Sequence, residues 1–175
     1  MKILTPLFTA LIIVGTFIKV PIPPVPITLQ TLFVFLIGLL LPTKAALASV
    51  FLYYFLGIIG LPVFSAGGGL AVFTGPTGGY MWGWTLAVLA ASLIMKGSDR
   101  QSIVKNVLVT LLMEVLLYIP GLLWLGYSRH LSFAATISGG LTPFIVGDVI
   151  KIAVAALAAK PLYPQVAKLL EKKEE

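Results

Sequence analysis

The sequence predicts an all-α integral membrane protein, with a single membrane domain over residues 1–175 and six transmembrane helices. The first observation is composition: 59% of the 175 residues are hydrophobic, only 10% are charged, and the mean hydropathy is +1.06. A soluble domain carries about 25% charged residues to cover its surface. The second observation is that charged or Gly/Pro-rich stretches divide the chain into apolar runs. The third is an uneven distribution of Lys and Arg among the connections between these runs.

Six apolar runs are expected to form the helices, since about 20 apolar residues are needed to cross a membrane. They cover residues 4–19, 28–41, 44–61, 78–95, 103–126 and 142–160, and a polar cytoplasmic tail follows at 161–175. The run at 28–41 is too short to cross about 30 Å unaided, so a tilted, partial or re-entrant element is expected there. In the last helix, Thr142 is expected to cap the first turn, where Pro143 is well tolerated.

The N-terminal run has a second interpretation, as a secretory signal peptide, because a short basic start precedes an apolar stretch. A signal peptide ends in a small-x-small cleavage site, however, and the residues that follow this run are apolar and rich in proline. We therefore expect a retained first helix.

Lys and Arg are strongly biased toward one side of the expected topology. Six crossings place both termini on the same side, and cytoplasmic connections carry the excess of Lys and Arg. With the termini inside, the cytoplasmic cations are nine of the twelve, namely Lys2, Lys44, Lys96, Arg100, Lys105, Lys160, Lys168, Lys172 and Lys173. Only Lys19 and Arg129 face outward, and Lys151 lies within the membrane. The bias predicts that the N and C termini are cytoplasmic.

The outward connections are long, apolar and rich in Gly and Pro. Nine of the 17 glycines fall between Gly57 and Gly83. Irregular backbone at membrane depth has to be buried in protein or face water, because lipid offers it no hydrogen bonds. We expect these loops to fold over the helices as a lid above an outward-facing cavity.

Several classes of function are excluded by residue usage. The chain has no Cys and a single His, which excludes disulfides, thiolate metal sites and His-based metal clusters. No nucleophile–base pair is visible and no GK[ST] sequence follows a glycine loop, so we expect neither an enzyme nor ATP hydrolysis by this chain. The net charge of +6 is explained by membrane orientation, so no nucleic-acid partner is expected. We also expect no cofactor.

Asp148 and Lys151 lie three residues apart within the last apolar run, on one face of its helix. A charge at the middle of a membrane helix costs roughly 2.5–3.5 kcal/mol on the insertion scale. The pair is either a structural brace between helices or part of a ligand or ion site, and ionisable residues within a membrane favour the functional interpretation. Glu114, with Tyr118 four residues later, is either hydrogen-bonded within the bundle or a ligand contact.

Two polar motifs at helix starts keep two interpretations each. GPTGGY, residues 75–80, is either an anion-binding helix start that Thr77 caps or a tight turn at a helix entrance. Gln30, between Thr28 and Thr31, either presents its amide to a polar ligand or caps the second helix. Trp82, Trp84 and Trp124 are expected at the membrane–water interface, where Trp is enriched.

Three segments, in this order, resemble the biotin-specific substrate-binding subunits (BioY type) of energy-coupling-factor transporters. They are VPIPPVPITLQTLFVFLIGLLL, LYYFLGIIGLPVFSAGGGLAVFTGPTGGY and PFIVGDVIK. The resemblance runs from about residue 5 to residue 160 and so covers nearly the whole chain.

The resemblance implies a biotin site near the outer surface, beneath the loops between helices 1 and 2 and between helices 3 and 4. It implies that Asp148 and Lys151 contact the ligand, through the ureido N–H groups and through the ureido or valerate oxygens. The full set of candidate substrate-binding residues is Asp148, Lys151, Gly75, Thr77, Gly78, Gly79, Tyr80, Gln30 and Tyr118. The partners implied are biotin, membrane lipid, a transmembrane coupling protein and two cytoplasmic ATPases. The implied location is the cytoplasmic (plasma) membrane of a prokaryote, as a multi-pass protein.

Two other functions remain as alternatives at this point. An ion-gradient-coupled carrier would use Asp148 and Glu114 as a relay, and its uptake would depend on a proton or sodium gradient. A structural membrane protein would use Asp148 and Lys151 as a brace, and a matched apolar pair would leave its function intact.

Overall fold

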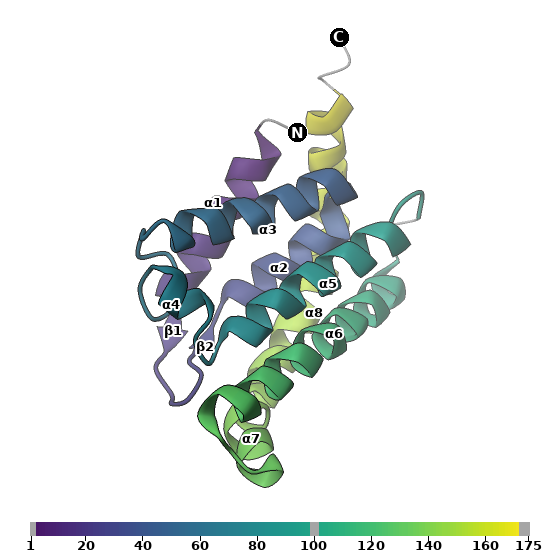
Figure 1. The fold of residues 1–175 in the computed structure, drawn as a ribbon. Helices are drawn as coiled ribbons and strands as arrows, with labels where there is room; N and C mark the ends of the chain where they lie inside the picture. The colour runs from purple at the N-terminus through teal and green to yellow at the C-terminus, as the bar shows by residue number, and fades with distance from the viewer. Residues whose placement is uncertain (1–2, 99–101, 172–175) are drawn as a thin grey trace.

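Regular structure in the computed structural model is almost entirely helical in residues 3–98 and 102–171, which the structure describes (Figure 1). The elements follow the chain as α1 (Leu4–Phe17), β1 (Lys19–Val20), β2 (Ile27–Thr28), α2 (Gln30–Leu40), α3 (Thr43–Ile58), α4 (Leu70–Phe73), α5 (Gly78–Ile94), α6 (Ile103–Arg129), α7 (Phe133–Gly140), the 3-10 turn η1 (Thr142–Phe144) and α8 (Ile145–Glu171). The beginning of α1 and the end of α8 lie together at the upper end of Figure 1, and the β1–β2 hairpin and α7 lie at the lower end.

Helix α2 forms the centre of the bundle and contacts α1, α3, α5, α6 and α8. Its 11 residues span only about 16 Å, which is consistent with the short element expected there. From Leu32 onward the helix is apolar all round, and a helix of that composition is stable only when it is surrounded by protein or lipid. Here the surroundings are protein, because every residue from Val34 to Leu41 is buried.

Short structures that the sequence did not predict close the lower end of the bundle. The β1 and β2 strands pair antiparallel, with Lys19 opposite Thr28, and join α1 to α2. The connection after α3 contains a bridge between Phe64 and Gly67 and the single-turn helix α4. The backbone of Gly69 has a φ of 101°, which a side chain would disfavour, and its N–H donates to Gly57 O at 2.7 Å.

The last helix differs from the prediction at both ends. It begins after the turn η1, and Thr142 does not cap it, because its hydroxyl donates instead to Ile137 O at 3.2 Å. At the other end, the segment predicted as a polar tail from residue 161 continues α8 to Glu171, through Pro161 and Pro164. Val166 is buried there and Tyr163 packs against the core, so tertiary contacts hold these turns in a helix despite the prolines.

Helix α6 is also longer than predicted, and an additional helix follows it. The helix continues to Arg129 and ends at His130, whose φ of 51° is left-handed. The next segment, predicted as an irregular connection, forms α7. Ser132 caps it by accepting a hydrogen bond from Ala135 N at 3.3 Å.

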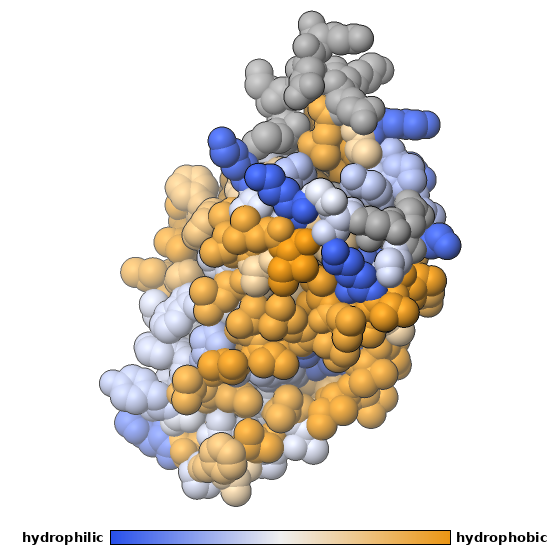
Figure 2. All heavy atoms as spheres, turned by 90° about the vertical axis from the view of Figure 1, so that its right-hand side faces the viewer, coloured by the Kyte–Doolittle hydropathy of each residue, from blue (hydrophilic) through white to orange (hydrophobic). Residues whose placement is uncertain are grey.

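The surface of the bundle is suited to lipid. Two segments are long and apolar enough to cross a membrane, Ile103–Arg129 and Phe133–Leu170, and four shorter apolar helices accompany them. Large apolar side chains point outward from these long helices, such as Leu123 on α6 and Val146 on α8, which are 71% and 74% exposed. Figure 2 shows a hydrophobic surface across the middle of the molecule, with hydrophilic residues gathered toward its upper end. The number of crossings, six, stays a prediction.

Candidate functional site

A cavity lies among α2, α3, α5, α6 and α8, and the β1–β2 hairpin and the connection after α3 cover one end of it. Six of the residues predicted to bind ligand line it, namely Gln30, Thr77, Tyr80, Tyr118, Asp148 and Lys151. The structure therefore brings together side chains that are up to 121 residues apart in the sequence, from Gln30 to Lys151.

Asp148 and Lys151 form a buried ion pair on α8, with 3.1 Å between Lys151 Nζ and Asp148 Oδ1. The residues are 6% and 7% exposed, respectively. The second carboxylate oxygen, Oδ2, accepts a hydrogen bond of 2.6 Å from the hydroxyl of Tyr118 on α6. Both oxygens of Asp148 thus have a donor within the protein, and each retains capacity for another hydrogen bond.

Glu114 lies one helical turn before Tyr118 and lines the same cavity. Both of its carboxyl oxygens are buried and neither makes a hydrogen bond of good geometry. The carboxyl group interacts electrostatically with Asp148 and with Lys151. Among the described residues that line the cavity, Lys151 is the one cation. The cavity therefore holds two carboxyl groups for a single ammonium group.

Aromatic side chains form the apolar walls of the cavity. The ring of Tyr53 lies 5.8 Å from that of Trp84 and 5.3 Å from that of Phe64, measured between centroids. Between α5 and α6, Tyr80 and Tyr118 meet edge to face at 5.9 Å. Trp84 is only 5% exposed, so its predicted place at the membrane interface is wrong. Nothing in the sequence distinguished Tyr53 or Trp84 from other aromatic residues of apolar helices.

The connection after α3, residues 59–69, forms the roof of the cavity, and hydrogen bonds attach it to neighbouring elements. The carbonyl of Val63 accepts from Thr16 Oγ1 at 2.9 Å and from the Tyr53 hydroxyl at 3.1 Å. Lys19 Nζ donates to the carbonyl of Ser65 at 2.6 Å. The roof loop after α3 is thereby connected to α1, to the hairpin and to α3.

Gln30 is part of the cavity wall and does not cap α2. Its Nε2 donates to the hydroxyl of Tyr53 at 2.6 Å, and the residue is 4% exposed. The helix begins after Leu29, without a side-chain cap. Gln30 thus connects the cavity wall to the roof, because Tyr53 in turn donates to Val63.

The GPTGGY motif is divided between the cavity and a helix contact. Thr77 and Tyr80 line the cavity, although Thr77 does not cap α5, and the Tyr80 hydroxyl donates to Gly140 O at 2.8 Å. Gly75, Gly78 and Gly79 are not among the residues that line the cavity.

These three glycines lie against neighbouring backbone and Trp124. The indole N–H of Trp124 donates to Gly75 O at 2.9 Å. A Cβ on Gly79 would collide with the carbonyl of Pro120 and with Trp124, and one on Gly78 would collide with the carbonyl of Phe73. We conclude that Gly79 allows α5 to approach α6 closely, whereas Gly75 and Gly78 lie against the backbone of α4.

The arrangement is suited to a small organic ligand with both hydrogen-bond donors and acceptors. Apolar walls with a few convergent polar groups are typical of small-molecule sites. Within the part of the chain that the structure describes, no group of three or more His, Cys, Asp and Glu residues is placed to hold a metal ion.

The sequence model of the BioY family matches residues 2–168. The chain belongs to the BioY family. This confirms the resemblance found in the sequence motifs.

Relatives in this family are similar over nearly their full length. The "Probable biotin transporter BioY" of Pyrococcus horikoshii is 40% identical over 160 residues, which cover 91% of this chain and 93% of the relative. The "Biotin transporter BioY" of Thermotoga maritima is 39% identical over 154 residues, which cover 87% and 89%. These relatives are named as transporters and not as enzymes.

A solved structure has the same fold. The crystal structure of the S-component for biotin from an ECF-type ABC transporter superimposes with a TM-score of 0.82 at 30% identity, and the match covers 90% of this chain and 87% of that chain. The chain is a membrane protein of the same fold as this S-component.

Proposed function

We propose that this protein is the biotin-binding membrane subunit of an ECF-type transporter and mediates the uptake of biotin into the cell. The observation that carries the proposal is the buried Asp148–Lys151 pair in a cavity of a BioY-family chain. Burial of a charged pair costs free energy unless the geometry satisfies both partners. A ligand with complementary polar groups explains why a membrane protein keeps such a pair.

The cyclic urea and the sulfur-containing ring of biotin match the chemistry of the cavity. Its cyclic urea has two N–H donors, which carboxylates accept, and a carbonyl oxygen, which the ammonium group of Lys151 can donate to. Its sulfur-containing ring is apolar and fits between aromatic walls such as Tyr53 and Trp84. Tyr118 holds Asp148 in place for this contact.

Energy for transport comes from other subunits in this proposal. The chain has no phosphate-binding GK[ST] motif of its own. As the family resemblance implies, a transmembrane coupling protein and two cytoplasmic ATPases power the delivery of biotin. The subunit crosses the plasma membrane of a prokaryote six times, with both termini in the cytoplasm.

Equilibrium binding of biotin to the detergent-purified protein tests the proposal. The native chain is expected to bind biotin, and Asp148→Asn is expected to bind about 10- to 100-fold more weakly, because a hydrogen bond to a charged group contributes about 1.5–3 kcal/mol. Lys168→Gln is the matched control, since it removes one charge from an exposed position of the same helix. Thermal unfolding of each variant separates loss of binding from loss of folding.

A folded native chain that does not bind biotin contradicts the proposal. Uptake in proteoliposomes that depends on a proton or sodium gradient would then favour a carrier that uses Asp148 and Glu114.

A further inference from the structure

A groove lies between the end of α6 and α7, and it shares no lining residue with the cavity described above. Its volume is about 400 Å³, which falls in the range of about 300–1,000 Å³ that is typical of ligand pockets. Its lining is apolar apart from Thr136, whose hydroxyl already donates to Ser132 O at 2.9 Å. The groove therefore offers a ligand apolar contacts and no free polar group.

The turn between α6 and α7 builds this groove. His130 ends α6 with a left-handed φ of 51°, and the N–H of Leu131 donates back to Gly126 O at 3.0 Å. Such a turn is a common way to end a helix, and here it places α7 beside the end of α6 (Figure 1). A Cβ on Gly126 would lie 3.0 Å from Thr136 Oγ1, so the two helices are close at this point. The groove runs along the line where they meet.

The rim of the groove is exposed and apolar. Leu123 on α6 is 71% exposed and Phe133 on α7 is 82% exposed, and both line the groove. Helix α6 is long and apolar enough to cross a membrane. An apolar groove that opens at the side of such a helix faces the acyl chains of the surrounding lipid, so an acyl chain is the occupant that fits it.

The length of the groove matches one leaflet of a bilayer. Ile119 is the first groove residue on α6, and Arg129 is the last residue of that helix. Ten residues of helix rise about 15 Å, and half of a hydrocarbon core of about 30 Å is also about 15 Å. An acyl chain that extends along the groove from Ile119 therefore ends in a headgroup at the level of Arg129.

Arg129 gives this end of the groove a positive charge. It is exposed, it lies three residues after Gly126, and it forms no ion pair within the described residues. The sequence contains no Asp or Glu between Glu114 and Asp148, and both of these line the buried cavity. A guanidinium group binds phosphate oxygens in pairs. A zwitterionic headgroup would find no acidic residue of this segment for its ammonium group, so the charge favours an anionic headgroup.

We propose that the α6–α7 groove binds one acyl chain of an anionic phospholipid from the leaflet at this end of the bundle, and that Arg129 binds the phosphate of the same lipid. The lipid is a second ligand, separate from the molecule that the cavity binds. The inference therefore goes beyond the proposed function and does not depend on it.

Photo-crosslinking of the detergent-purified full chain tests this site. The probe is phosphatidylglycerol with a diazirine in the middle of one acyl chain, and mass spectrometry locates the residues that it labels. We expect labelling to concentrate on groove residues between positions 119 and 137. Unlabelled phosphatidylglycerol should suppress this labelling at about fivefold lower concentration than phosphatidylcholine, because one basic residue near the surface contributes about that factor.

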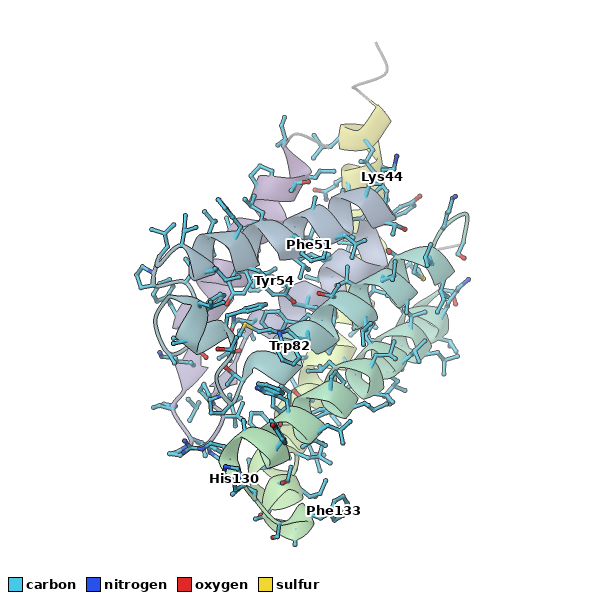
Figure 3. The ribbon with its side chains drawn as sticks, in the orientation of Figure 1. Lys44, Phe51, Tyr54, Trp82, His130 and Phe133 are labelled. Atoms are coloured by element: carbon cyan, nitrogen blue, oxygen red, sulfur yellow. The ribbon has the colours of Figure 1, made fainter. Side chains whose placement is uncertain are left out.

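Two variants with matched controls separate the groove from the charge. Leu123→Trp fills the groove and should remove most of the labelling, whereas Leu108→Trp makes the same change at an exposed position of α6 outside the groove. Arg129→Gln should abolish the preference for phosphatidylglycerol. Lys44→Gln also removes one exposed positive charge, but at the opposite end of the bundle (Figure 3), and should keep the preference.

Labelling spread evenly over the exposed faces of α6 and α8 would overturn the inference, since lipid would then coat the helices without a site. Equal suppression by the two phospholipids, or an unchanged preference in Arg129→Gln, would show that Arg129 binds no phosphate there. Crosslinks from the groove to a second copy of the chain would identify a different occupant and would also overturn the inference. Each of these results leaves the binding of biotin as a separate question.

Discussion

Lys151 has a role in the cavity that no other described lining residue can take over. It pairs with Asp148 and interacts electrostatically with Glu114. Removal of the Asp148 carboxylate leaves the carboxyl group of Glu114 beside the ammonium group. Removal of Lys151 leaves two carboxyl groups facing each other with no cation among the lining residues to separate them.

We therefore predict that Lys151→Met destabilises the protein more than Asp148→Asn does. The breaking of a buried pair by removal of one partner costs about 3–5 kcal/mol, and this range applies to Lys151→Met. The cost of Asp148→Asn should fall below it. Thermal unfolding in detergent without ligand measures both, and a lower midpoint for Asp148→Asn than for Lys151→Met would show that Glu114 does not support Lys151.

At the scale of elements, the cavity depends on how closely α5 approaches α6. Gly79 and Gly83 are one turn apart on α5, a spacing of small residues that allows helix backbones to pack closely in membranes. A Cβ on Gly83 would lie 2.6 Å from Leu117 Cα and from Leu117 O. Leu117 and Tyr118 line the cavity, so the helix contact also sets the position of the cavity wall.

We predict that Gly83→Ala lowers the free energy of unfolding by about 1–3 kcal/mol, because overpacking forces the two backbones apart. Gly147→Ala on α8 is the control, since a Cβ there meets no atom within 4 Å. The control should be neutral or stabilising by up to about 1 kcal/mol, because Ala favours a helix. Similar unfolding midpoints for both variants would contradict close packing at Gly83.

At the scale of the whole molecule, strongly hydrophilic residues gather toward one end of the bundle. Lys44 lies near the end where α1 begins, and His130 and Phe133 lie near the opposite end (Figure 3). The hydrophilic residues of the upper end in Figure 2 lie above a broad apolar surface. In the orientation proposed from the Lys and Arg distribution, this upper end faces the cytoplasm.

The absence of Cys from the sequence makes this orientation directly testable. We predict that Ala134→Cys, an exposed position on α7, reacts with a membrane-impermeant maleimide in intact cells. Ser98→Cys, which follows α5, should react only after the membrane is permeabilised. The reverse labelling pattern would show that the termini face outward, and labelling of both in intact cells would contradict the proposed number of crossings.

Much of the fold and part of the site could be predicted because they depend on local patterns. Apolar runs set the helices to within a few residues at most ends, as in α3, which was expected at 44–61 and spans Thr43–Ile58. The pairing of Asp148 with Lys151 followed from a spacing of three residues on one helix. The continuation of α8 past Pro161 could not be predicted, since it depends on contacts of Tyr163 and Val166 with the core.

The sequence by itself determined the membrane environment, the family, and the presence of two charges on one face of the last helix, because composition and short spacings are properties of the chain alone. Only the tertiary structure decided which side chains surround those charges. The donor from Tyr118 and the carboxyl of Glu114 come from α6, which packs beside α8, and the wall at Trp84 comes from α5, which packs against α6. Their positions depend on the distance and rotation between helices, which are set by contacts such as those of Gly79 and Gly83 with α6.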